Sequence, residues 1–154
     1  MTSTQKEHPL HALARLVGGA WHIEAISFPD PPLAYHRFAW EAGGAAISGR
    51  SYPAGGGAPS SEGLWYWHPG EGVVRGVFVG PADPRALSEY LSVRAEGDGL
   101  VAELATHDAQ GKSQRFKEVF TFTGPDRYAW TLHMHLPDGT RQIAEGSFIR
   151  KSEG

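Results

Sequence analysis

The chain has 154 residues, of which 40% are hydrophobic and 20% are charged, and its formal net charge at pH 7 is −3. This length fits one globular domain with a single core. The slight negative charge, with no basic run longer than Arg150–Lys151, argues against a nucleic-acid partner. The absence of cysteine excludes a disulfide framework and a thiolate metal site.

The sequence gives no sign of a membrane segment or of a secretion signal. No stretch approaches the ~20 apolar residues of a membrane span, and the N-terminus lacks an uninterrupted apolar run. We therefore expect a cytoplasmic protein without a membrane partner, and we leave a homodimer open. Residues 1–9 are expected to form a flexible tail, and residues 10–150 form the folded domain.

A short helix is predicted within "HPLHALARLVGG", which directly follows the tail. The stripe-forming residues Leu10, Leu13, Ala14 and Val17 recur at helical spacing. Gly18 suits the left-handed conformation at which helices commonly end.

Glycine and proline turns divide the rest of the chain into segments of strand length. Turns such as "EAGGA", "HPGEG", "EGDG", "DAQGK", "TGPD" and "LPDG" are short enough to join neighbouring strands antiparallel. The ten predicted strands cover residues 20–28, 34–42, 45–53, 62–69, 73–80, 86–96, 99–107, 113–123, 126–136 and 140–150.

These elements predict an all-β protein built as one up-and-down antiparallel barrel of about ten strands, with the short helix closing one end. Closure is favoured because an open sheet of sequential strands would leave two long edges exposed. A barrel of this size is wider than side chains alone readily fill, so it should enclose a cavity. The sequence therefore predicts binding of a small apolar or amphipathic molecule by a non-catalytic carrier or sensor.

The ends of the domain carry the residues of a known superfamily. "LVGGAWH" resembles the Gly-x-Trp opening of the calycins, which include the lipocalins and the fatty-acid-binding proteins, and "GSFIRK" places Arg150 at the end of the last strand. The chain is similar along nearly its whole length to small bacterial lipocalin-like proteins of unknown function, and more distantly to nitrobindin. The resemblance implies that the Arg150 guanidinium stacks on the Trp21 indole and that the pair seals the barrel floor.

Nitrobindin barrels hold haem, which makes a haem protein with peroxynitrite or nitric-oxide chemistry the alternative function. The resemblance places the haem ligand, a histidine, on the last strand, but "QIAEGSFIR" (142–150) contains none. Haem would then need a substitute, of which the candidates are His36, His107, His133 and His135. We accordingly expect no cofactor, with haem as the alternative.

Strand alternation indicates which side chains face the cavity. "WTLHMHL" places its apolar residues on one face, which should point inward, and His133 and His135 on the other, where two nitrogen ligands are too few for a zinc site. The alternative is a barrel for polar ligands lined by its less apolar face, in which His135 would be a pocket residue. The ligand-binding residues predicted from alternation and from the aromatic clusters are His36, Phe38, Trp40, Tyr52, Trp65, Trp67, Phe78, Glu118, Phe120, Trp130, Leu132 and Met134.

Charged and polar residues on the strands supply the remaining candidates. Glu118 lies between two phenylalanines on an apolar face, and a buried glutamate needs either a positively charged partner or a raised pKa. An inward arginine beside it would make either a structural ion pair or a binding anchor. No catalytic motif is present, and we predict no catalytic residues and no metal. The polar strand residues that could hold a carboxylate are Arg50, Tyr52, Arg75, Tyr90 and Arg94.

Overall fold

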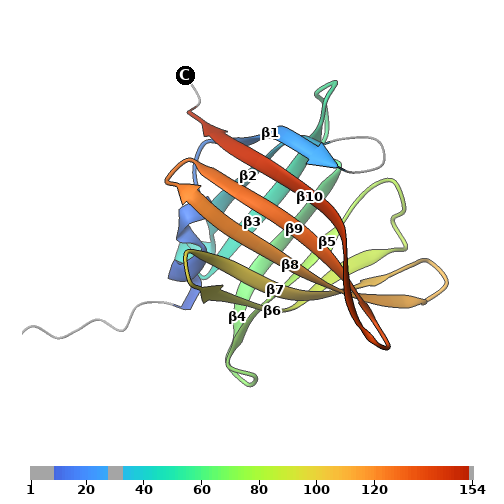
Figure 1. The fold of residues 1–154 in the computed structure, drawn as a ribbon. Coiled ribbons are helices and arrows are strands. Elements are labelled where there is room, and N and C mark those ends of the chain that lie inside the picture. Colours follow the sequence, from blue (N-terminus) through green and yellow to red (C-terminus); the bar gives the residue numbers. More distant parts are fainter. Residues whose placement is uncertain (1–8, 28–32, 153–154) are drawn as a thin grey trace, which may run out of the picture.

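The computed structural model describes residues 9–27 and 33–152, and its ten strands close into a barrel (Figure 1). Each strand pairs antiparallel with its sequence neighbours, and the last strand pairs with the first. The strands are β1 Ala20–Ser27, β2 Leu33–Glu41, β3 Ala46–Pro53, β4 Ser61–His68, β5 Val73–Val79, β6 Leu87–Glu96, β7 Gly99–His107, β8 Ser113–Gly124, β9 Arg127–Leu136 and β10 Gly139–Lys151.

The all-β barrel predicted from the sequence is confirmed, with strand ends within one residue of those expected. Gly and Pro turns mark strand ends sharply, which explains this agreement. Residues 1–8 of the predicted tail lie outside the described residues, and so does the "PDPP" link at residues 29–32. A second short 3₁₀ turn, η2 Ala42–Gly44, joins β2 to β3.

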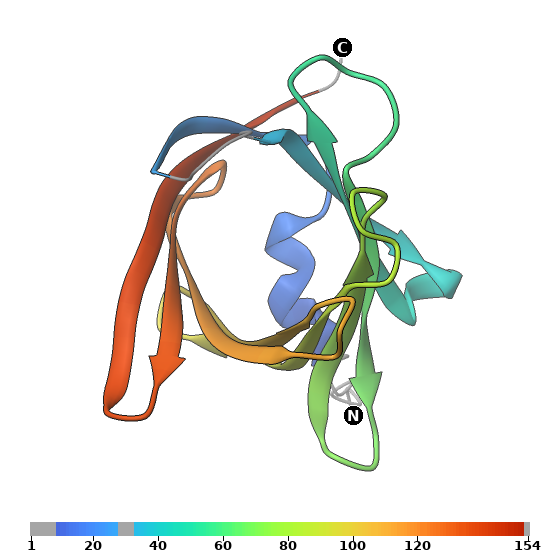
Figure 2. The same cartoon turned by 90° about the vertical axis from the view of Figure 1, so that its right-hand side faces the viewer.

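The N-terminal helix is a 3₁₀-helix, η1 Pro9–Leu16, and it is seen within the ring of strands in Figure 2. Its buried face consists of Leu10, Leu13 and Leu16, all fully buried. The predicted stripe holds for Leu10 and Leu13, and Val17, just beyond the helix, packs against the core. The prediction included Ala14 in place of Leu16, because a 3₁₀-helix repeats every three residues rather than every 3.6. Ala14 and Val17 are only partly buried. No helix in the described part of the chain is long and apolar enough to cross a membrane.

Trp21 and Arg150 join the first strand, the last strand and the helix at the barrel floor. The two residues are register partners across the seam between β1 and β10. The guanidinium carbon of Arg150 lies 4.5 Å from the centre of the Trp21 ring, as the resemblance implied. The fully buried Trp21 indole donates a hydrogen bond to the carbonyl oxygen of Leu16 at 2.9 Å.

Arg150 also links the last strand to the end of the helix and to the turn before β9. Its guanidinium donates hydrogen bonds to the carbonyl oxygens of Arg15 at 3.0 Å, Val17 at 3.1 Å and Pro125 at 2.6 Å, and to the carboxylate of Asp126 at 2.8 Å. A side chain on Gly19 would contact the Arg150 stem at 2.9 Å. The helix is thereby fixed against the floor.

We predict that Trp21→Ala lowers the free energy of unfolding by about 3–5 kcal/mol, because it removes the largest buried side chain at the seam and leaves a cavity. Denaturant unfolding followed by circular dichroism measures this loss. An unchanged unfolding midpoint would show that the indole contributes nothing to the barrel floor.

Candidate functional site: the barrel cavity

The barrel encloses a cavity of about 1100 Å³. Turn residues between β5 and β6, and between β7 and β8, contribute to its lining. These turns lie at the end of the barrel opposite η1, because strand direction alternates and η1 packs where β1 begins. The cavity is therefore closed by the helix at one end and reached from the other.

Eight of the twelve predicted ligand-binding residues line this cavity. They come from β2, β4, β5, β8 and β9, and strand alternation together with the aromatic clusters had placed them on the inner face. The eight residues are His36, Phe38, Trp65, Phe78, Glu118, Phe120, Trp130 and Leu132.

The other four do not line it. Trp40 and Trp67 share the inner side of their strands with Phe38 and Trp65, but they lie near the closed end, where they are 37% and 36% exposed. Met134 is the register partner of the cavity residue Phe116 but is not itself part of the lining. Alternation gives the side of a strand and not the depth along the barrel.

Tyr52 lies on the outer face. It is not part of the cavity lining, and it is the register partner of Tyr35, whereas its neighbour Ser51 is the partner of the cavity residue His36. The Tyr52 ring stacks on the Tyr35 ring at a centroid distance of 4.7 Å, and the Arg37 guanidinium lies 5.7 Å from the Tyr52 ring centre.

Four aromatic rings form a contiguous wall. The ring centroids of Trp65 lie 5.3 Å from those of Phe38, 5.4 Å from Phe78 and 5.6 Å from Tyr90. Phe78 and Tyr90 are 5.4 Å apart. The Trp65 indole nitrogen is buried and has no hydrogen-bond partner within the part of the chain that the structure describes. This cluster gives the cavity a broad apolar surface.

Glycines in the middle of β4 and β5 make room for these rings. A Cβ on Gly63 would lie 2.4 Å from the Phe78 ring, and one on Gly76 would lie 2.3 Å from the Trp65 ring. Glycine inside a strand indicates close approach of another group. The glycines within "EGLWYWH" and "VVRGVFV" therefore carried a signal for the ring cluster that the sequence analysis did not use.

Glu118 is the most buried charged group of the cavity wall, with 8% of its surface exposed. One carboxylate oxygen accepts a hydrogen bond from the Tyr90 hydroxyl at 2.5 Å, and the other accepts one from the Trp130 indole nitrogen at 2.7 Å. Burial raises the pKa of Glu118, while these two hydrogen bonds oppose the rise. Of the two predicted alternatives, the raised pKa is the one seen, because both hydrogen-bond donors are neutral and no arginine pairs with Glu118 among the described residues.

Tyr90 was considered as a polar strand residue but was not assigned to the site. It lies 28 positions before Glu118 in the sequence, on β6. The register between β6 and β7 shifts just after Tyr90. Such a bulge is not readable from alternation, so the pairing with Glu118 could not be predicted.

His36 lies on the cavity wall close to Phe148, with ring centroids 4.7 Å apart. Its Nδ1 atom is 3.4 Å from the Ser51 hydroxyl oxygen. Burial lowers the pKa of His36 from 6.5 to about 4. The imidazole is therefore neutral at neutral pH.

His133 and His135 face away from the cavity, as predicted. Their neighbours Trp130 and Leu132 line it, whereas His133 Nε2 lies 3.0 Å from the Thr131 hydroxyl and His135 Nε2 lies 2.7 Å from a Glu103 carboxylate oxygen. No group of three or more potential metal ligands occurs among the described residues.

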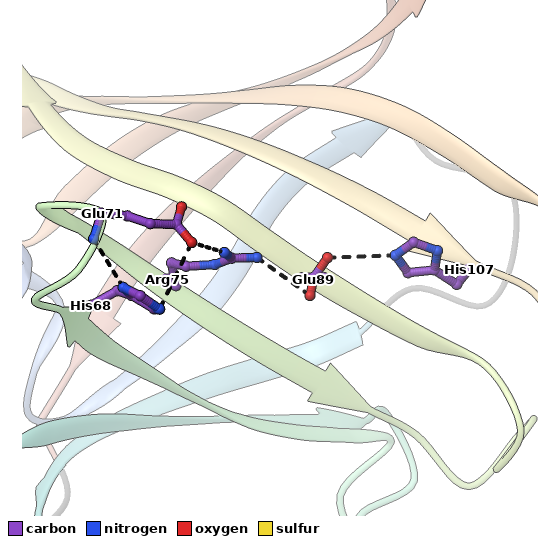
Figure 3. A network of polar contacts seen from close by, with 5 residues as sticks. All are labelled: His68, Glu71, Arg75, Glu89 and His107. Atoms are coloured by element: carbon purple, nitrogen blue, oxygen red, sulfur yellow. Dashed lines mark hydrogen bonds and ion pairs between the residues drawn. The ribbon is translucent and has the colours of Figure 1, made fainter.

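The three arginines considered as carboxylate partners, Arg50, Arg75 and Arg94, lie on the outer wall or at the rim of the barrel. Figure 3 shows Arg75 between Glu71 and Glu89, at 2.5 Å and 3.4 Å, with His107 Nε2 at 3.7 Å from Glu89. His68 completes the network beside Glu71. Arg94 pairs with Glu96 at 3.2 Å on an exposed surface, and Arg50, which contributes to the cavity lining, lies 3.8 Å from Glu62.

Comparison with known proteins supports the fold and goes no further. No family model and no curated protein matches the chain. The chain resembles the crystal structure of Rv2717c from M. tuberculosis. The TM-score is 0.56 at 17% sequence identity, and the match covers 96% of this chain and 99% of that one. At this identity the likeness concerns the ten-stranded barrel alone.

We predict that acidification destabilises the protein in part through His36. The folded-state pKa of about 4 lies below the ordinary 6.5, so the unfolded chain takes up a proton first as the pH falls between these values. The stabilisation is complete above about pH 6.5 and is lost toward pH 4. His36→Gln should lose less stability than the wild type over this range, as measured by urea unfolding at each pH. An equal loss would place the acid sensitivity elsewhere.

Proposed function

We propose that the protein is a calycin-like, non-catalytic carrier or sensor, and that it binds a small apolar or amphipathic molecule in the barrel cavity. The observation that carries this is the 1100 Å³ cavity with its aromatic wall. Ligand pockets are mostly apolar and contain a few polar groups that orient the ligand. The cavity has this character, with Glu118, Tyr90 and Trp130 as its inner polar groups and Arg50 near its rim.

The apolar wall supplies the driving force for binding. Each Å² of apolar surface removed from water contributes about 25 cal/mol. A ligand that covers the faces of Trp65, Phe78 and Phe120 would gain this stabilisation, with stacking in addition. Because most of the lining belongs to paired strands, with turns only at its outer end, the aromatic wall is formed before the ligand arrives.

Strand β9 offers a matched test of this proposal, because its neighbouring residues face opposite sides of the wall. Leu132→Trp should reduce affinity for the neutral probe N-phenyl-1-naphthylamine more than tenfold, about 1.4 kcal/mol, because it fills cavity volume. The double variant His133→Gln/His135→Gln should bind as the wild type does. Probe emission and tryptophan quenching measure both. Binding that survives Leu132→Trp, or that is lost in the double variant, would contradict a site inside the barrel.

Haem binding is the second candidate, and one observation favours it. His36 faces the cavity, and its lowered pKa keeps the ring neutral, as iron ligation requires. His133 and His135 face outward, and His107 lies at the rim in contact with Ser113 at 2.6 Å. His36 would therefore hold the iron, and the aromatic wall would contact the porphyrin. Bound haem would supply the peroxynitrite or nitric-oxide chemistry.

Titration with haemin distinguishes the two candidates. Ligation by His36 should shift and sharpen the Soret band of the wild type, and His36→Gln should abolish this change. A spectrum identical in the two proteins would remove His36 as the ligand.

A cytoplasmic location, a homodimer and the absence of a nucleic-acid partner stay predictions from the sequence.

A further inference from the structure

Glu118 is a buried acid without a positively charged partner. Among the described residues no ion pair reaches it, and its two hydrogen-bond donors, Tyr90 and Trp130, are neutral. The basic residues of the cavity lining belong to other parts of it. Arg50 lies beside Glu62, and Lys112 belongs to the turn between β7 and β8. An ionised carboxylate in such a place is stable only when a cation or several donors compensate it.

The hydrogen bonds within the protein do not use all the accepting capacity of the Glu118 carboxylate. An ionised carboxylate can accept about four hydrogen bonds, and Glu118 accepts two. The residue lines the cavity, so the remaining capacity is available to a ligand. The ligand group that completes such a site is a donor with positive charge.

The surroundings of Glu118 also suit a cation. Its two donors carry aromatic rings, and Tyr90 packs edge-on against Phe78 and Trp65. The faces of tyrosine and tryptophan attract ammonium groups, more strongly where water is excluded. Carboxylate and rings thus favour the same kind of charge.

We propose that the ligand carries a protonated amine on an apolar or aromatic body, and that Glu118 is its counter-ion. This inference rests on the proposed function, since it assigns a chemical class to the ligand of the same cavity. The fold holds Glu118 away from bulk water beside the cavity, so an amine that reaches it meets little competition from solvent, and its positive charge favours the ionised carboxylate. An anionic ligand would be repelled at this depth, because the basic side chains Arg50 and Lys112 of the lining belong to other parts of the cavity.

Three probes with one aromatic body test the proposal. They are 1-naphthylmethylamine, which is cationic at neutral pH, the neutral 1-naphthalenemethanol and the anionic 1-naphthoate. Calorimetric titration should show that the wild type binds the amine at least tenfold more tightly than the alcohol, and naphthoate most weakly. Glu118→Gln should bind the alcohol as before and the amine no better than the alcohol.

Glu103→Gln is the matched control. It makes the same change of charge on the neighbouring strand β7, where Glu103 pairs with His135 on the outer wall. It should keep the preference for the amine. Equal loss of preference in both variants would assign the effect to net charge and overturn the proposal.

The outcomes also separate this inference from the proposed function. If the wild type binds the alcohol and the amine equally, the cavity binds ligands but Glu118 is not a counter-ion. If none of the three probes binds, the proposed function fails and the inference fails with it. Should Glu118→Gln not fold, the wild-type preference between amine and alcohol still decides.

Discussion

The contact between Arg150 and Trp21 is the constraint on which the barrel depends. A ten-stranded meander closes only if its first and last strands meet in register, and these two residues are partners across that seam. The same guanidinium binds carbonyl oxygens on both sides of Leu16 and one in the turn before β9. One side chain therefore fixes strand closure and helix position together.

Closing the floor determines where a ligand can enter. With η1 packed inside the ring of strands at one end (Figure 2), the cavity lies toward the turns at the other end, and several of those turn residues line it. The inner face near the floor is filled by Leu10, Leu13, Leu16 and Trp21, and the inner face beyond them is left to line the cavity. The division between core and pocket thus follows from the length of a single helix.

Most of the fold could be predicted from the sequence, and so could those features of the site that depend on local sequence pattern. Turn residues mark strand ends, and period-two alternation assigns the inner face, which correctly placed His36, Trp65 and Trp130. Neither pattern reports position along the barrel axis, so Trp40 and Trp67 were assigned to the pocket although they lie near its closed end. Part of the helix face was misjudged because a 3₁₀-helix has a different period.

The hydrogen-bond partners of Glu118 could not be predicted from the sequence, for a different reason. Its position between phenylalanines showed that an acid faces the interior, but its partners come from β6 and β9 and depend on strand register. The sequence left two alternatives open for a buried acid, a positively charged partner such as arginine or a raised pKa. The fold uses two neutral donors and places its arginines on the rim and the outer wall.

Because Glu118 has only neutral partners, the stability of the barrel depends on whether a ligand is bound in its cavity. Because burial raises the pKa of Glu118, the folded protein holds a proton there in a pH range where the unfolded chain has released it, and stability falls as the pH rises through that range. Tyr90, Tyr128 and Trp130 face the same carboxyl, and none of them supplies positive charge. A cationic ligand would favour the ionised form and displace the proton. Ligand binding would then offset the destabilisation that the empty cavity develops as the pH rises, since the charge that the fold leaves without a counter-ion is the charge that the ligand neutralises.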